Sequence, residues 1–470
     1  MQALPHQVRP IQKALEYLRD PKRKKYEVIV GPTASGKSFL IAEIARQYGK
    51  PILVLQPNKE LLEQNAEKSQ ILGSTVTVCS ASLKQRDIST FTYATIGSIK
   101  NDVQKLIDLG VETLFIDECH FKFSPEEGSE FQKFLKALNP KKVIGFTATP
   151  FRLASPTMTE GSKLKMLTRT RPKIFSDYID VVQIKEVTDG GWWSKIKYEA
   201  HEFDESGLEV NTSGSEYTDE SVKTAIKAQN INNTIYLRAK QLLKEGCPSI
   251  LIFMDSVENA ETMAKHLPDA IAIHGKTPAK IRDQGVKDFK SGKIKVLVNM
   301  GVFTTGFDYP DLRAIIMGRP TMSLSLYYQI IGRGTRISKA TGKEECLYID
   351  YCNNVKRFGK IENLTIEDIP EVGWAVCNGE IVLTGYAMDG PIVTRSKAMT
   401  LARRGNKHID KIWFGKYSGT ALDELPIYYI EYLLYKTGWD FSSGKMGTLK
   451  TKLLQVLKEN EENKLLLKTA

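Results

Sequence analysis

The sequence predicts an α/β protein with two doubly wound parallel-sheet domains and a small C-terminal α+β module. Residues 1–170 and 231–365 each alternate short apolar runs with helical stretches, which is typical of parallel strands joined by helices. A glycine-rich loop follows the first apolar run, and no such loop occurs in the second stretch. Residues 171–230 are polar and irregular, and we expect a linker with peripheral strands there.

The predicted strands are short and rich in β-branched residues. In the first domain we expect strands at 27–30, 52–55, 76–79, 113–116 and 143–146, with helices from Phe39, Lys59 and Pro125. In the second we expect strands at 249–254, 270–273, 295–299, 313–317 and 346–350, and helices near 257–267, 278–291 and 323–332. Residues 366–400 should form short strands, such as 380–386, and a basic linker before a module at 401–470.

Residues 31–38 read G-P-T-A-S-G-K-S and match a phosphate-binding loop. Gly31 and Gly36 let the backbone around Thr33 turn its N–H groups toward phosphate oxygens. Lys37 is expected to reach the β- and γ-phosphates, and the Ser38 hydroxyl is expected to bind Mg²⁺. The helix that follows would point its N-terminus at the same anion.

Two carboxylates, Asp117 and Glu118, follow the apolar run at 113–116 in the box D-E-C-H. The carboxyl ends of parallel strands are where open α/β sheets bind ligands. One carboxylate, Asp117, would hold Mg²⁺ through water, and Glu118 would orient and deprotonate an attacking water. An acidic pair alone is more often a solvated turn, but together with the loop it predicts ATP hydrolysis.

Composition favours a polyanionic partner. The net charge is +11 and the pI is near 9.1, and residues 395–470 hold 14 Lys and Arg against 8 Asp and Glu, which is +6 of that total. None of the six cysteines forms a C-x-x-C pair, so we expect reduced thiols in a cytosolic protein and no zinc site. We expect neither a signal peptide nor a membrane span.

Five further boxes, in order along the chain, resemble motifs of superfamily 2 helicases and translocases. They are P-N-K-E-L at 57–61, T-I-G-S at 95–98, T-A-T-P at 147–150, T-T-G-F-D at 304–308 and Q-I-I-G-R-G-T-R at 329–336. The resemblance implies tandem RecA-like domains that use ATP and Mg²⁺. It implies nucleotide contacts at Gly306 and Asp308, and nucleic-acid contacts at Pro57, Lys59, Thr95, Gly97 and Thr304.

The last of these boxes has a physical interpretation of its own. A γ-phosphate transition state spreads charge that an arginine from another domain stabilises. Arg333 and Arg336 are suitable groups, and Gln329 would hold the attacking water. Because these side chains and Lys37 belong to different domains, ATP would close the cleft and hydrolysis would open it. The alternative for either arginine alone is a solvated surface residue.

Within the superfamily, the strings at 146–153, 302–310 and 319–336 are very like those of RadD-type bacterial repair helicases, over residues 1–352. The cysteine-rich zinc region of that family is absent, and phage fork-remodelling and branch-migration helicases are similar compact relatives. D-E-C-H in place of D-E-A-D favours DNA. The resemblance implies forked or branched DNA with single-strand/duplex junctions, in replication, recombination or repair, in the cytoplasm of a bacterial or phage-infected cell. A single-strand-binding or recombination protein is a candidate partner.

Several alternatives stay open. An RNA helicase and a DNA-stimulated ATPase that remodels protein–DNA complexes without processive unwinding are the competing functions. A third, an accessory protein with a degenerate motor, is opposed by the intact residues Lys37, Asp117, Glu118, Arg333 and Arg336. The start A-L-P-H-Q resembles the family's L-R-P-Y-Q, which favours Gln7 for adenine recognition over Gln12. The pair Trp192-Trp193 is either buried against the second domain or an exposed wedge for a junction.

The C-terminal stretch W-F-G-K-Y-S-G at 413–419 resembles a module of exodeoxyribonuclease-X-like proteins. Tyr429, Tyr432 and Leu433 have helical spacing and are expected in its core. A basic run is usually only solvated, but we expect phosphate contacts from the basic residues Arg403, Arg404, Lys407, Lys411 and Lys416.

Overall fold

The structure is a computed structural model. It describes residues 2–470 apart from 122, 124–127, 155–162, 171–172, 213–214, 303–306, 387–391, 409–411, 413–416, 418–419, 423–424, 436–452, 455 and 458–470, and apart from the side chains of 154 and 403–408. The chain forms two compact units, of which the first comprises Met1–Glu367 and Trp374–Ile392, and the second comprises Asp368–Gly373 and Val393–Ala470.

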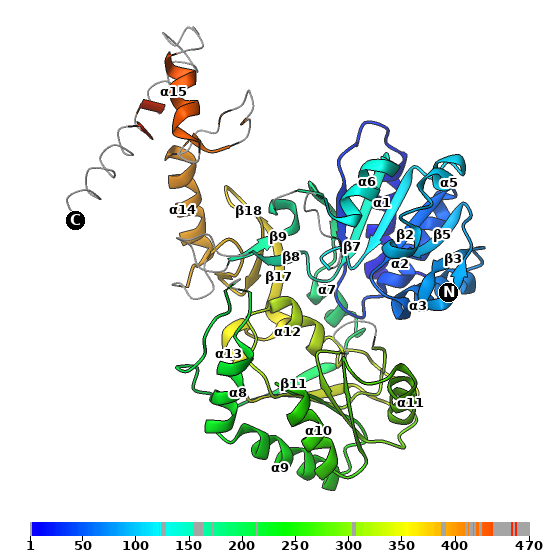
Figure 1. Cartoon of the computed structure of the whole chain (residues 1–470), viewed down its shortest axis with the longest axis vertical. Helices are drawn as coiled ribbons and strands as arrows, with labels where there is room; N and C mark the ends of the chain where they lie inside the picture. Colours follow the sequence, from blue (N-terminus) through cyan, green and yellow to red (C-terminus); the bar gives the residue numbers. More distant parts are fainter. Residues whose placement is uncertain are drawn as a thin grey trace, which may run out of the picture. The chain divides into compact units, whose positions relative to one another are not determined.

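The first unit contains two large sheets (Figure 1). The first sheet has eight strands in the order β10-β1-β7-β6-β2-β5-β3-β4, all parallel to their neighbours except the antiparallel pair β3–β4. Its strands are β1 Glu27–Val30, β2 Ile52–Gln56, β3 Thr77–Ser80, β4 Gln85–Arg86, β5 Phe91–Thr95, β6 Thr113–Asp117, β7 Lys142–Thr147 and β10 Asp177–Val181.

Both faces of this sheet are buried, which explains its uninterrupted apolar strands. Val28 and Val30 pack into one core cluster, whereas Ile29 packs into another with α1, α2 and α3. The alternation follows from the period of two along a strand. The helices of this domain are α1 Pro5–Arg19, α2 Lys37–Tyr48, α3 Lys59–Ile71, α4 Ile96–Ile99, α5 Val103–Asp108 and α6 Glu130–Leu138.

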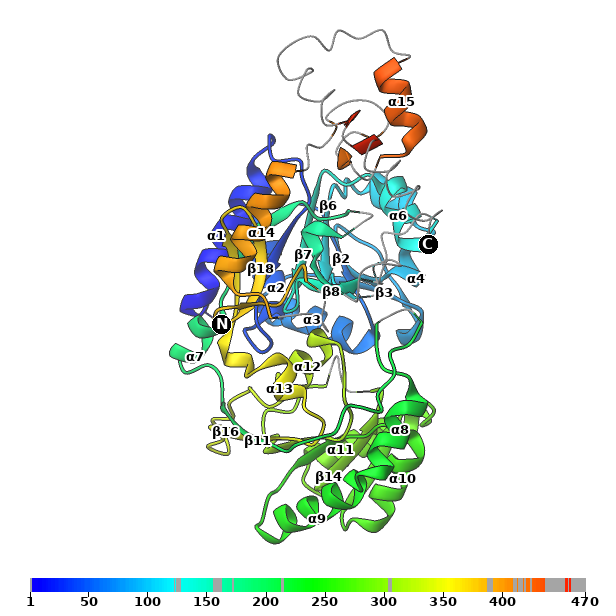
Figure 2. The ribbon, with the colours of Figure 1, turned by 90° about the vertical axis from the view of Figure 1, so that its left-hand side faces the viewer.

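The second sheet has six strands in the order β11-β16-β15-β12-β14-β13, and all of its pairs are parallel. In Figure 2, α8, α9 and α10 lie along it, and they share a core cluster with Ile250 and Ile252. The strands are β11 Lys195–Ala200, β12 Ile250–Phe253, β13 Ala270–His274, β14 Val296–Met300, β15 Ala314–Met317 and β16 Glu345–Asp350. The helices are α8 Asp219–Ala228, α9 Ile231–Lys244, α10 Val257–His266, α11 Ala279–Lys290, α12 Leu324–Ile331 and α13 Asn354–Phe358.

The predicted fold class is confirmed: the protein is α/β with tandem doubly wound parallel sheets. The segment 171–230 provides an edge strand to each sheet, since β10 pairs with β1 and β11 pairs with β16. Helix α1 and strand β5 were not predicted. The strand expected at 380–386 is shorter, because β19 comprises only Ile381–Val382 against β18 Gly373–Asn378.

The remaining elements are small. The first unit also holds β8 Phe151–Ala154 paired with β9 Lys163–Met166, α7 Ile184–Asp189, and β17 Leu364–Ile369 next to β18. The second unit holds α14 Arg395–His408 and α15 Ile427–Tyr435. Across the described residues, no helix has the length and apolar character needed to cross a membrane.

Candidate active site

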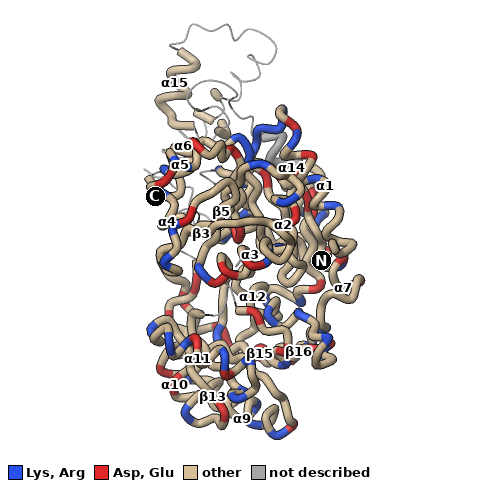
Figure 3. Tube along the Cα trace, turned by 90° about the vertical axis from the view of Figure 1, so that its right-hand side faces the viewer, with Lys and Arg blue, Asp and Glu red and all other residues tan. Residues whose placement is uncertain are grey.

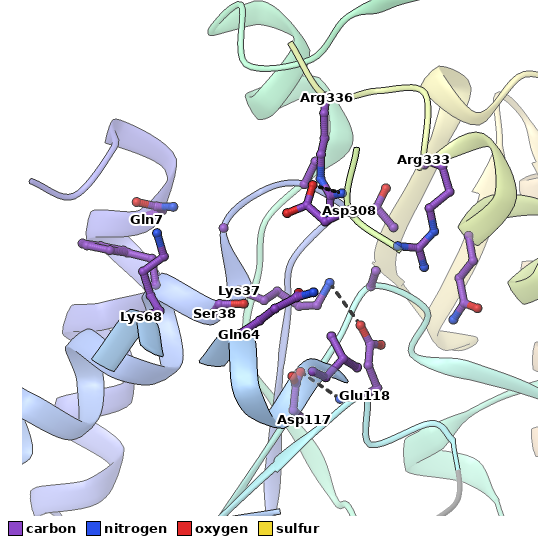
Figure 4. A pocket seen from close by; sticks show the side chains of 18 of the residues that line it. Gln7, Lys37, Ser38, Gln64, Lys68, Asp117, Glu118, Asp308, Arg333 and Arg336 are labelled. Carbon is purple, nitrogen blue, oxygen red and sulfur yellow. Dashed lines mark hydrogen bonds and ion pairs between the residues drawn. The ribbon is translucent and has the colours of Figure 1, made fainter. Parts of the chain in front are cut away.

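The phosphate-binding loop lies between β1 and α2, at the carboxyl edge of the first sheet. Gly36 has φ +84°, in the region that favours glycine, and a Cβ there would overlap the Gln7 amide. Lys37 begins α2 and its ammonium lies 3.5 Å from Glu118 Oε1 (Figure 4). The loop therefore presents its lysine toward the carboxylates at the end of β6.

Asp117 and Glu118 are held in distinct environments. Asp117 is buried and accepts hydrogen bonds from the Glu118 backbone N–H and from Asn65 Nδ2, at 2.9 and 2.8 Å. Burial, followed by the charge of Glu118, raises its pKa. Burial alone would raise the pKa of Glu118 too, but neighbouring cations, Lys37 foremost, lower it. Glu118 is therefore ionised at neutral pH, and its φ of +45° is a strained conformation for a non-glycine residue.

The second domain brings Arg333 and Arg336 to the same cavity, which has a volume of about 410 Å³. Arg336 forms an ion pair with Asp308, and Arg333 Nη1 donates to the Phe307 carbonyl at 2.9 Å. Figure 4 shows the Arg333 guanidinium pointing toward Lys37 and Glu118. Burial and Arg336 lower the pKa of Arg333 to about 10, so it stays protonated at neutral pH.

A chain of hydrogen bonds links the two domains behind the cavity. Gln329 Nε2 lies 2.9 Å from His120 Nε2, and His120 Nδ1 lies 2.8 Å from Thr147 Oγ1. Burial lowers the pKa of His120 to about 4, so the ring is neutral and Gln329 donates to it. Ser325 Oγ also donates to Thr149 Oγ1 at 3.0 Å. The histidine of D-E-C-H thus joins the T-A-T-P box to the arginine-bearing box.

Most of the predicted nucleotide residues line this one cavity. Gln7 is among them and donates to the Ser35 carbonyl at 2.8 Å, whereas Gln12 is exposed and lies elsewhere on α1. Gly31 begins the loop but does not line the cavity, and Gly306 lies outside the described residues. The predicted residues that line it are Gln7, Thr33, Gly36, Lys37, Ser38, Asp117, Glu118, Asp308, Gln329, Arg333 and Arg336.

The predicted nucleic-acid contacts of the first domain share the carboxyl edge of the sheet but lie outside the cavity. Pro57 follows β2 and Thr95 ends the neighbouring β5. Lys59 begins α3 and Gly97 is exposed. Thr304 lies outside the described residues.

The structure describes only some of the residues predicted to be functional in the C-terminal module. Lys411 and Lys416 lie outside the described residues, as do the side chains of Arg403, Arg404 and Lys407 on α14. On α15 Leu433 is buried, but the expectation that Tyr432 is a core residue is wrong, because it is 48% exposed. Ile430 and Leu433 form the buried stripe of this helix, while Tyr428, Tyr432 and Tyr435 follow the i, i+4, i+7 spacing of its exposed stripe.

Two contacts of the site were not predicted. Asn65 of α3 is fully buried and bonds Asp117; the available signal was a polar residue in register with the apolar Leu62 and Ala66. Trp193 is also buried, and its indole N–H donates to the Thr33 carbonyl at 2.8 Å. Of the two alternatives for the tryptophan pair, burial against the second domain is confirmed for Trp193, and the exposed wedge is wrong for this residue.

Two family models match the chain. The model described as "Type III restriction enzyme, res subunit" matches residues 1–152, and "Helicase conserved C-terminal domain" matches residues 234–338. The first match covers every strand of the first sheet except β10, and the second match covers β12 to β15 of the second sheet. Together with the cavity they define the class of the two domains: residues 1–152 and 234–338 are similar to the paired domains of superfamily 2 helicases.

The curated relatives include a phage protein, a putative helicase and a restriction-enzyme subunit. A "51.5 kDa protein" of Lactococcus phage (isolate 7-9) is 28% identical, covering 66% of this chain and 62% of the relative. A "Putative ATP-dependent helicase IRC3" of Saccharomyces cerevisiae is 26% identical over 56% and 37% of the two chains. The "Type I restriction enzyme EcoAI endonuclease subunit" of Escherichia coli is 22% identical over 78% and 49%. The chain thus spans about a third to three-fifths of the length of these relatives.

Solved structures support the fold. A fragment of a putative HsdR subunit of a type I restriction enzyme from Vibrio vulnificus has a TM-score of 0.55 at 19% identity, covering 76% of this chain and 65% of the other. The type ISP restriction-modification enzyme LlaBIII bound to DNA has a TM-score of 0.53 at 15% identity, covering 74% and 28%.

The residues of the cavity fit ATP and Mg²⁺. Thr33 Oγ1 and Ser35 Oγ are buried without a hydrogen-bond partner among the described residues, which suits a loop that surrounds phosphate oxygens. A Cβ on Gly31 would lie 2.9 Å from Ser35 Oγ, so the loop has no space for a side chain there. Mg²⁺, when bound, would offset phosphate charge, and Ser38 and Asp117 are the residues that would hold it.

We expect Glu118→Gln to bind ATP but to lower turnover about a hundredfold or more, because the amide keeps the shape and loses the base. Steady-state ATPase rates and binding of a fluorescent nucleotide measure the two effects. Glu112→Gln, in the exposed loop before β6, is the matched control and should behave as wild type. Loss of nucleotide binding together with turnover would give Glu118 a structural role instead.

Proposed function

We propose that this protein is an ATP-dependent DNA helicase or translocase that acts on forked or branched DNA in replication, recombination or repair. The observation that carries the proposal is the hydrogen-bonded chain from Gln329 through His120 to Thr147. It joins the hydrolysis site of one domain to the arginine-bearing segment of the other. A change at the γ-phosphate therefore has a direct route to a change in the relative position of the two domains.

The choice of DNA has separate support. The box is D-E-C-H, and the matches include a restriction-enzyme family model and a type I restriction subunit. We also propose the finer likeness to RadD-type and phage fork-remodelling helicases, and a cytoplasmic site of action with a single-strand-binding or recombination protein as partner. Arg333 and Arg336 are proposed to act on the γ-phosphate, and Gln7 on adenine.

The test is an ATPase and strand-separation assay with matched single strands, duplexes, forks and four-way junctions, made in DNA and in RNA. We expect the greatest stimulation and unwinding with forked or branched DNA. Stronger stimulation by RNA would favour an RNA helicase. Stimulation by DNA without strand separation would favour remodelling of protein–DNA complexes.

The second unit is proposed to anchor one arm of the DNA. Figure 3 shows Lys and Arg positions along α14, which carries Arg395, Lys397, Arg403, Arg404 and Lys407 and no acidic residue. The three exposed tyrosines of α15 offer ring faces to unpaired bases. The resemblance of this unit to the exodeoxyribonuclease-X-like module remains a prediction.

Deletion of residues 395–470 is expected to spare basal ATPase activity, because every cavity residue lies before Ile337. DNA binding should weaken and become less dependent on salt. The log–log slope should fall by roughly 0.9 for each phosphate that the tail neutralises in the full chain. Binding titrations at several salt concentrations measure the slope, and fork-unwinding rates should fall more than hydrolysis.

A full-length variant with Arg403, Arg404 and Lys407 changed to alanine tests the same idea without deletion. Its control carries three alanines at Lys223, Lys227 and Lys240, on α8 and α9. If the tail variant and the wild type show equal slopes of log binding constant against log salt concentration, the tail does not bind DNA and serves in folding or in docking a partner. Loss of basal ATPase on deletion would show that the tail supports the fold of the motor.

A further inference from the structure

The segment Gly332–Arg336, which carries both arginines, is held by a buried lysine outside every motif. Lys343 is 1% exposed, and its ammonium donates to the carbonyls of Gly334 and Arg336 at 2.7 and 2.6 Å. Burial lowers the pKa of this ammonium to about 8, which reflects the cost of removing a charge from water. An apolar side chain would fill the space at a lower cost, so the particular contribution of Lys343 is the fixed position of the two carbonyls.

A second group bonds the same backbone from the connector, defined here as residues 182–194 between β10 and β11. Ser194 is 2% exposed, and its hydroxyl donates to the Arg336 carbonyl at 2.7 Å while its N–H donates to the Thr335 carbonyl at 2.6 Å. The Arg336 carbonyl thus accepts from both Ser194 and Lys343. The backbone of Arg336 cannot shift without loss of these hydrogen bonds.

Trp193 extends this arrangement to the phosphate loop. Its backbone forms an antiparallel bridge with Arg336, and its indole N–H donates to the Thr33 carbonyl in the other domain. Thr33 also touches the arginine-bearing segment directly, because a Cβ on Gly332 would overlap Thr33 Oγ1. One side chain therefore connects the loop that surrounds the phosphates with the backbone that carries the arginines.

We propose that Trp193, supported by Ser194 and Lys343, is a positioning residue that sets how closely Arg336 approaches the γ-phosphate. It touches no phosphate itself and acts through Arg336. The hydrogen bond from Trp193 to Thr33 joins the two domains, and its length sets the separation of the phosphate loop and Arg336. Misplacement of a charged group by about 1 Å lowers a rate on the order of a hundredfold. Loss of this one hydrogen bond is therefore expected to lower the rate of ATP hydrolysis measurably.

The first test is Trp193→Phe in the full chain, which removes the indole N–H and keeps an aromatic ring in the space. We expect kcat for ATP to fall about five- to tenfold, the effect of one lost hydrogen bond. KM and the melting temperature should stay near wild type. Trp192→Phe is the matched control, since within the described part of the chain the neighbouring indole has no hydrogen bond to the loop, and it should leave kcat unchanged. An unchanged kcat in Trp193→Phe, or a rise in KM alone, overturns the proposal.

The second test separates positioning from general destabilisation. In an Arg336→Ala background, Trp193→Phe should cause no further loss of kcat, because its effect passes through Arg336. Independent, multiplicative losses would overturn the proposal. Ser194→Ala, which removes a smaller group, should lower kcat in the same direction and lose its effect in the same background. If Arg336→Ala alone leaves kcat unchanged, the role of that arginine and the positioning role both fail, whatever DNA assays show.

Discussion

Lys37→Ala is expected to abolish ATP turnover while leaving the fold and nucleic-acid binding largely intact. The ammonium is the cation of the phosphate loop, and it already lies 3.5 Å from Glu118 at the end of β6. Loss of a preorganised charge at the site where negative charge develops costs on the order of a thousandfold or more. ATPase assays and thermal melting measure the two parts of the expectation.

The control for this variant lies at the other end of the same helix. Lys50→Ala removes an exposed lysine just after α2 and should change neither turnover nor melting temperature. A Lys37→Ala protein that hydrolyses ATP near the wild-type rate would overturn the assignment of the nucleotide site.

Arg333→Ala and Arg336→Ala are each expected to lower turnover about a thousandfold, which is within the range for arginines acting on a transferring phosphoryl group. ATP affinity should change little, because these charges act mainly on the transition state. The two arginines are oriented differently, since Arg336 pairs with Asp308 and Arg333 points toward Glu118. Single-turnover hydrolysis and nucleotide binding distinguish the two effects.

Arg238→Ala is the matched control for the arginine variants. Arg238 forms an ion pair with Glu199 on the second domain and does not line the cavity, so its loss should leave turnover unchanged. Wild-type turnover in either arginine variant would mean that the second domain does not act on the γ-phosphate.

The strands and the cavity residues were predictable for different reasons. The apolar runs of β1, β6 and β12 are continuous because both sheet faces are covered, and such runs are visible in the sequence. The phosphate loop was visible because its glycines and lysine have a fixed spacing. Helix α1 was missed; the resemblance at residues 3–7 favoured Gln7 over the exposed Gln12, but spacing alone does not say which of the two faces the cavity.

The contacts that were missed join distant parts of the chain. Asn65 reaches Asp117 across 52 positions, and Trp193 reaches Thr33 across 160. No local spacing indicates such a pair. Tyr432 was misplaced for a related reason: helical spacing gives the relative directions of side chains, but does not say which direction faces a partner.

The connector between β10 and β11 restricts how far the motor can open. The strand before the connector, β10, pairs with the first sheet, and the strand after it, β11, pairs with the second sheet. Within this stretch, residues 182–194 are therefore the part of the chain that must change conformation when the two domains move relative to each other. Part of that length is the helix α7, and Gly191, at φ +69°, lies directly before the tryptophans. A short connector of this kind allows the two domains to rotate relative to each other but limits how far apart they can move. In the proposed function, the range of domain movement in each cycle of ATP hydrolysis is therefore limited by the length of this connector.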